Sequence, residues 1–242
     1  NFVDVIDFIS YDLREDIVDE QPLIKAITCH ALSLLVPNPS NAEVVGPAAS
    51  GKTTTLMSIL SYIPAEYVEI CEIISPQTMR YGANKWFDKE FDEDVTDVHV
   101  KLQGELECAD KNNKMEINIK IKEFEETYVK CNDLENKLIV LLENPGINVL
   151  KQFRCFLEHD DWMIMSKSVQ DGQQITMNTR GWPAFIFCTA DGKSENANKQ
   201  IAEQVESRFN TLTPTTSPDK IEKILNLKAN KRCTLVNPNK SF

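Results

Sequence analysis

Short apolar runs separated by polar segments predict an α/β protein built on a parallel sheet. Residues 138–142 and 184–188 are apolar at every position, which is typical of strands buried on both faces. Residues 42–45 and 67–74 are two further β-prone stretches. Because buried strands need helices on both sides, the pattern predicts a parallel sheet sandwiched by helices.

Other segments carry the spacing of helices. Apolar residues recur at helical spacing through residues 1–36, and Pro22 suits the first turn of a helix that starts near Glu20. Residues 147–158 and the polar stretch 195–209 also predict helices.

These elements divide the chain into three parts. We expect an N-terminal helical segment at 1–41, a central α/β core at 42–215 and a C-terminal linker or tail at 216–242. A last helix is indicated around 221–225, and a C-terminal lid domain is missing or truncated. The first residue is not Met, which suggests a fragment or a trimmed chain.

Two segments alternate between apolar and polar residues, which is the pattern of β-hairpins. Residues 98–107 and 115–122 alternate at a period of two, with turn-forming residues between them. This pattern predicts a β-hairpin inserted into the core at about 88–130. A second hairpin is predicted around the turn residues Asp171 and Gly172.

One loop carries a motif for nucleotide binding. The stretch from Gly46 to Thr53 fits the phosphate-binding pattern G-x-x-x-x-G-K-[ST] at every fixed position. In this pattern the glycines allow tight turns, backbone N–H groups surround the phosphates, the lysine reaches the β- and γ-phosphates, and the threonine hydroxyl binds Mg²⁺. A β-prone run precedes the loop and a helical stretch follows it, as the motif requires.

We therefore expect a site for a nucleoside triphosphate and Mg²⁺. Its predicted binding residues are Gly46, Pro47, Ala48, Ala49, Ser50, Gly51, Lys52, Thr53 and Thr54. The chain has no Asn-Lys-x-Asp sequence of the guanine-recognising kind, which favours ATP over GTP.

Polar residues at the ends of two predicted strands are candidates for catalysis. Glu143 and Asn144 follow one buried run, and Thr189 follows the other. Ligands of parallel α/β sheets bind at the carboxyl ends of the strands. We expect Glu143 to align the attacking water or to help hold Mg²⁺, Asn144 to orient the same water, and Thr189 to sense the γ-phosphate. Thr189 could instead cap a turn at the strand end.

Composition bears on the class of partner. The net charge of −11 disfavours a broad DNA-coating surface, although a narrow basic loop inside a pore is compatible with it. The seven cysteines form no C-x-x-C pair, which argues against zinc ligation and a disulfide framework. No apolar run is long enough to span a membrane and the first residues do not resemble a signal peptide, so we expect a cytoplasmic protein without membrane contact.

The order of these motifs resembles that of the AAA+ ATPases. The shared features are the phosphate-binding loop, a strand ending in an acid, a helix, a hairpin, a second strand with a polar end, and Ser207-Arg208-Phe209. Within these ATPases, the order over residues 20–215 resembles the superfamily 3 and minichromosome-maintenance helicases. The segment 180–190 also resembles replication-type ATPases of mobile elements and prokaryotes.

The resemblance implies roles for two basic residues. Arg208 stands where the family has an arginine finger, which would reach the γ-phosphate bound to a neighbouring subunit of a homo-oligomeric ring. Lys167 stands in the hairpin that resembles the DNA-contacting pore loop of these helicases. Both residues are also compatible with ordinary surface positions. One acid of the usual Asp-Glu pair is missing at Glu143-Asn144, which indicates slower hydrolysis.

Two functions follow as expectations. The first is an ATP-hydrolysing oligomeric motor on DNA, a helicase or translocase in replication. The alternative is an AAA+ switch or loader with slow ATP turnover that recruits protein partners. A P-loop kinase acting on a small molecule is a third class, which the inserted segment and the context of Arg208 disfavour.

Overall fold

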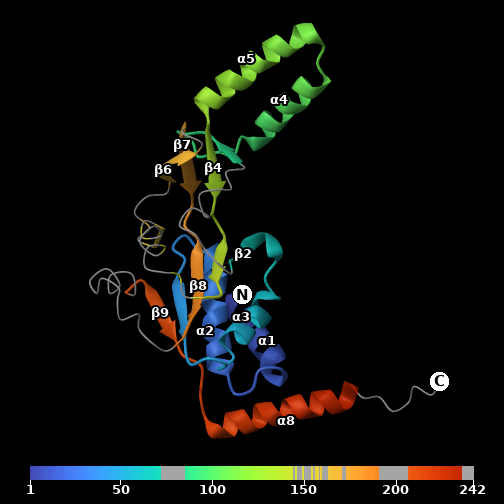
Figure 1. Ribbon diagram of the computed structural model, residues 1–242, viewed down its shortest axis with the longest axis vertical. Helices are drawn as coiled ribbons and strands as arrows, with labels where there is room; N and C mark the ends of the chain where they lie inside the picture. The colour runs from blue at the N-terminus through green and yellow to red at the C-terminus, as the bar shows by residue number, and fades with distance from the viewer. Residues whose placement is uncertain are drawn as a thin grey trace, which may run out of the picture. The chain divides into compact units, whose positions relative to one another are not determined.

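A computed structural model describes most of the chain (Figure 1). The described residues are 1–71, 85–143, 163–170, 173–190 and 207–235, with the single positions 145, 149, 154, 156, 157 and 159. They form two compact units. The first unit comprises Asn1–Ile73, Leu138–Gly146 and Ala184–Phe242, and the second comprises Ile74–Lys137 and Ile147–Pro183.

The first unit contains a sheet of five parallel strands in the order β2-β5-β8-β1-β9. The strands are β1 (Asn41–Val45), β2 (Val68–Cys71), β5 (Leu138–Leu141), β8 (Ala184–Thr189) and β9 (Phe209–Leu212). All residues of β5 and β8 are buried, which confirms the prediction that the two apolar runs are central strands.

Helices flank this sheet. The helices of the first unit are α1 (Phe2–Asp12), α2 (Gln21–Leu32), α3 (Lys52–Leu60) and α8 (Pro218–Leu235), with short 3₁₀ turns η1 (Leu13–Glu15), η2 (Ser33–Leu35) and η3 (Ala65–Tyr67). Helix α2 packs on α1, on α3 and on the sheet, and Ile24 and Ile27 on it are fully buried. The predictions of helices at 1–36, with Pro22 in the first turn of α2, and at 221–225 are confirmed.

Strand β9 was not predicted. Phe209 opens β9 and packs its ring edge-to-face on Phe187, with 4.9 Å between the centroids. Ser207 and Arg208 lie in the turn before it, so the predicted helix does not extend to residue 209. The rest of that predicted helix lies outside the described residues. In the predicted helix at 147–158, the described positions 149, 154, 156 and 157 are helical.

The second unit contains a mixed sheet in the order β3-β4-β7-β6. The strands are β3 (Lys85–Phe87), β4 (Val129–Asp133), β6 (Met163–Gln170) and β7 (Gln173–Arg180). Strands β6 and β7 are antiparallel, and Gln170 pairs with Gln173 at their turn. This pairing confirms the second predicted hairpin.

The first predicted hairpin is wrong. Residues 98–107 and 115–122 lie in two helices, α4 (Thr96–Cys108) and α5 (Lys111–Thr127), which pack on each other. Ile117, Ile121 and Phe124 are spaced by four and three residues, so some of the apolar residues of this segment also fit one helix face. Ile121 and Phe124 are buried on that face. The insertion at about 88–130 is therefore a helical hairpin, not a β-hairpin.

Aromatic residues outside the two alternating segments pack against the helical hairpin and stabilise it. Trp86 of β3 stacks on His99 of α4 at 4.8 Å between ring centroids and meets Phe124 of α5 edge-to-face at 5.5 Å. Tyr128, directly after α5, lies 4.4 Å from Phe124. Both helices are thus tied to β3 at their ends nearest the sheet, which favours the helical arrangement.

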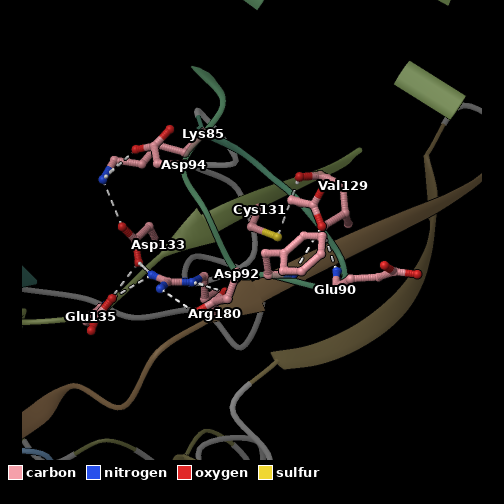
Figure 2. A network of polar contacts seen from close by, with 11 residues as sticks. Lys85, Glu90, Asp92, Asp94, Val129, Cys131, Asp133, Glu135 and Arg180 are labelled. Atoms are coloured by element: carbon pink, nitrogen blue, oxygen red, sulfur yellow. Dashed lines mark hydrogen bonds and ion pairs between the residues drawn. The ribbon is translucent and has the colours of Figure 1, made fainter. Parts of the chain in front are cut away.

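A buried arginine at the end of β7 organises the second unit (Figure 2). Arg180 donates Nε and Nη2 to the two carboxylate oxygens of Asp92, each at 2.7 Å. Its Nη1 donates to Asp133 at 2.8 Å and to Glu135 at 2.7 Å. The guanidinium also lies 4.3 Å from the ring centre of Phe87. Burial alone would lower the pKa of Arg180, but the hydrogen bonds to Asp92 and Glu135 and the charge of Asp133 outweigh it and raise that pKa.

The backbone next to this network admits only glycine. Gly181 has a φ of +89°, and a Cβ there would lie 2.4 Å from the backbone nitrogen of Glu135.

Substitutions at Gly104 distinguish a helix from a strand at this position. Gly104 is exposed in α4, and an added Cβ would meet nothing within 4 Å. We expect Gly104→Ala to stabilise the second unit by about 1 kcal/mol and Gly104→Val by less, because alanine is the better helix former. All three tryptophans belong to this unit, so urea unfolding followed by tryptophan fluorescence measures the difference. A valine variant more stable than the alanine variant would indicate a strand, because β-branched residues favour strands.

Removing the Arg180 charge is expected to destabilise the second unit strongly. Arg180→Met leaves three carboxylates without their shared cation, which should cost about 3–5 kcal/mol. The matched control is Lys85→Met, whose side chain is 42% exposed and pairs with Asp133, so its loss should cost about 1 kcal/mol or less. Equal losses in the two urea unfolding curves would contradict the importance of the buried network.

Candidate nucleotide-binding site

The loop at 46–51 joins the end of β1 to the start of α3, as the phosphate-binding motif requires. Gly51 has φ +90° and ψ 6°, a left-handed conformation that favours glycine. Ala49 also has a positive φ, of 61°, and the Ser50 N–H donates to the Pro47 carbonyl at 3.3 Å. The loop therefore turns tightly before the helix begins.

The Lys52 side chain folds back over this loop. Its Nζ donates to the carbonyl oxygens of Gly46 at 2.6 Å and of Pro47 at 2.7 Å, and lies 3.5 Å from the Ser50 hydroxyl. The ammonium group is thus held over the loop by the loop's own main chain. A phosphate group bound by the loop would lie within reach of this charge.

The first turn of α3 offers backbone donors at the same place. The Thr55 N–H makes the first bond of the helix, to the Gly51 carbonyl at 2.8 Å. The N–H groups of residues 52–54 precede it and have no carbonyl within the helix to bind. The Gly51 cap offers no side chain, and the Thr53 and Thr54 side chains are exposed. Together with the helix dipole, these donors favour an anion.

Strand β8 lies between the loop strand β1 and the acid-bearing strand β5, and the register aligns their ends. Val45 of β1 pairs with Thr189, and Phe187 pairs with Leu141 of β5. Glu143 follows Leu141 by two residues, as Thr189 follows Phe187, so both polar residues come at the same edge of the sheet. The Gly46 N–H donates to the Thr189 carbonyl at 3.3 Å.

The side chains of this edge differ in exposure. Thr189 is buried and Glu143 is exposed. Asn144 lies outside the described residues. The sheet thus brings Thr189 to the start of the loop and ends the acid-bearing strand at the same edge, while the predicted roles of these residues stay predictions.

Cys188 is a neighbour of the site that sequence reasoning treated only as a buried apolar residue. It is buried, as predicted. Burial raises the pKa of its thiol, while a hydrogen bond with the Thr53 side chain and the charge of Lys52 act in the opposite direction. The thiol therefore lies under the start of α3, where it connects β8 to the residue expected to bind Mg²⁺. Its place directly before Thr189 is the one sequence signal that could have indicated this contact.

Close packing, not the predicted turn geometry, favours a glycine at position 46. Among the described glycines, the positive φ angles belong to Gly51 and Gly181. A Cβ on Gly46 would instead lie 3.1 Å from Cδ of Pro214 and 3.2 Å from the Ser50 hydroxyl. Pro214, which follows β9, therefore covers the first residue of the loop so closely that a side chain has little room.

Two basic residues, Arg208 and Lys167, complete the predicted set. Asn41, the first residue of β1, pairs with Phe209, so Arg208 lies at the amino edge of the sheet, opposite the loop. The five residues of β1 separate the two edges by about 16 Å, which exceeds the reach of one side chain. Arg208 therefore does not contact a nucleotide bound by its own loop. Lys167 lies in β6 of the second unit, where it pairs with Thr176.

Comparison with known proteins adds no relative: no protein family matches the chain, and no curated protein matches it. Among the described residues, none of the helices combines the length and hydropathy needed to cross a bilayer. The resemblance to AAA+ ATPases therefore rests on the motifs and their order.

Proposed function

We propose that the protein is an AAA+-like ATPase that binds ATP and Mg²⁺ on the loop at 46–54. The observation that carries this proposal is the Lys52 ammonium, held over a glycine loop between a buried parallel strand and the start of a helix. A surface loop that matched the motif by chance would not be expected at the carboxyl edge of a parallel sheet with its lysine folded over its own carbonyl oxygens.

Hydrolysis would use the residues at the strand ends. The N–H groups of the loop and of α3 bind the phosphates, and Lys52 neutralises charge that develops on the β- and γ-phosphates. The Thr53 hydroxyl holds Mg²⁺, which polarises the phosphates when bound. Glu143, with Asn144, orients the attacking water, and Thr189 senses the γ-phosphate.

The active form in this proposal is a homo-oligomer, with a ring as the closed arrangement. Arg208 lies at the sheet edge opposite the loop, so it can act on a nucleotide only when that nucleotide is bound to another copy of the chain. A head-to-tail contact of this kind closes into a ring when the rotation between copies allows it.

The leading function is a motor on DNA, a helicase or translocase in replication, with Lys167 on the β6–β7 hairpin as the candidate DNA contact. It is supported by the motif order and by the hairpin. The second candidate is a switch or loader with slow turnover. It is favoured by the single acid at Glu143-Asn144 and by apolar residues exposed on the α4–α5 hairpin, a feature of protein-binding surfaces. These residues are Val98, Val100, Met115 and Ile119.

Steady-state ATP hydrolysis, with and without single-stranded and duplex DNA, tests the proposal. We expect Lys52→Ala to lower turnover by about 10²-fold or more, because it removes the charge that stabilises the transferred phosphate. The control is Lys25→Ala, which removes an exposed lysine paired with Asp7 and should leave turnover unchanged. Full activity in Lys52→Ala would overturn the site.

The same assay separates the two functions. Strong stimulation by DNA that is lost in Glu143→Gln supports the motor. Tight nucleotide binding with slow turnover that is indifferent to DNA supports the switch.

Mixing two inactive variants tests the placement of Arg208. We expect Lys52→Ala and Arg208→Ala each to be inactive alone, because one lacks the loop lysine and the other lacks the cation for its neighbour. Mixed oligomers contain interfaces with an intact loop on one copy and an intact Arg208 on the next, so mixing should restore ATP hydrolysis. An Arg208→Ala variant with full activity, or a mixture as inactive as its parts, would contradict the role in trans.

A further inference from the structure

We propose that the buried ion pair between Glu20 and Lys220 positions the phosphate-binding loop and thereby sets its affinity for nucleotide. The pair acts through residues 213–217, which we call the strap and which join β9 to α8. This inference rests on the proposed nucleotide site, and it adds two residues that neither the motif nor the resemblance indicates.

The ion pair holds the strap by its main chain. Glu20, at the start of α2, accepts the Thr215 N–H on its two carboxylate oxygens at 3.0 and 3.2 Å. Lys220, in the first turns of α8, pairs with Glu20 and donates to the Thr215 carbonyl at 2.8 Å. Both polar groups of one strap residue are therefore bound, and the Ser217 hydroxyl accepts the Lys220 N–H at 3.1 Å.

Burial of this pair indicates a purpose other than stability. Glu20 and Lys220 are only 3% and 5% exposed. Removing two charges from water costs about as much as their attraction returns, so a buried pair adds little net stability compared with apolar residues of the same size. What such a pair supplies is a defined geometry, because either charge left alone is strongly unfavourable.

The geometry reaches the loop through the residue before Thr215. Pro214 has a fixed φ and lies against Gly46, where a Cβ would meet its Cδ at 3.1 Å and its Cγ at 3.3 Å. Gly46 is also the residue whose carbonyl accepts the Lys52 ammonium and whose N–H binds the Thr189 carbonyl. The strap, the loop lysine and the end of β8 therefore all contact Gly46. A shift of the strap would move the Gly46 carbonyl that holds the Lys52 ammonium.

A pair of substitutions on the same helix tests this inference. Lys220→Met removes the cation of the buried pair, whereas Lys223→Met removes an exposed cation that pairs with Asp19. Titration with a fluorescent ATP analogue should show an affinity about tenfold weaker for Lys220→Met, within the usual range for coupled sites, and an unchanged affinity for Lys223→Met. In hydrolysis, KM should rise while kcat at saturation is kept, because Lys52, Thr53 and Glu143 are intact.

Pro214→Ala provides a second variant, because Lys220→Met can lower stability by leaving Glu20 alone. Pro214→Ala removes the contact with Gly46 and strands no charge, so it should also weaken nucleotide binding in a chain whose thermal melting shows it to be folded. Hydrogen exchange adds a readout that a purely structural role would not move. Nucleotide should slow exchange of the Thr215 amide in the wild type and in Lys223→Met, but not in Pro214→Ala.

The outcomes separate this inference from the proposed function. A wild-type chain that does not bind the analogue overturns the proposed function and the inference with it. Binding that is lost in Lys52→Ala but equal in the wild type, folded Lys220→Met and Pro214→Ala overturns the inference alone. If Lys220→Met does not fold, Pro214→Ala decides the result.

Discussion

The parallel pairing of β8 between β1 and β5 is the constraint on which the candidate site depends. Parallel strands bring their carboxyl ends to one edge, and here that edge carries the glycine loop, Thr189 and Glu143. Any antiparallel pairing among these three strands would send one of these groups to the other edge. The complete burial of β5 and β8 places both strands in the interior, covered on both faces.

The parts of this arrangement that the sequence predicts are those with local causes. The apolar runs at 138–142 and 184–188 have no alternation, so they fit only strands covered on both sides. The loop motif can also be predicted, because it depends on turn geometry and one lysine within a few consecutive residues. What holds the site comes from distant segments. Pro214 follows Gly46 by 168 positions in the sequence, and Lys220 is 200 residues from Glu20. No local sequence pattern can therefore predict these contacts.

The helical hairpin shows why a clear local pattern can mislead. A period of two over residues 98–122 places apolar side chains on one face of a strand but on two faces of a helix. The sequence alone favours the strand, whereas the aromatic contacts of Trp86 and Tyr128 hold the inner face of the helices. The helical arrangement leaves apolar side chains in water on the outer face, where Met115 and Ile119 are 74% and 51% exposed.

The Arg180 network joins segments of the second unit that are far apart in sequence. Strand β4 is followed directly by β5, and β7 is followed directly by β8. Asp133 pairs with Arg180 in the second unit, and Leu138 pairs with Ala184 in the first, so both pairs of strands are parallel and nearly in step. Among the described residues, each unit buries one cation, Lys220 beside Glu20 in the first and Arg180 among three carboxylates in the second. In both cases the cation joins segments far apart in sequence, and removal of either charge would leave a largely buried carboxylate without that partner.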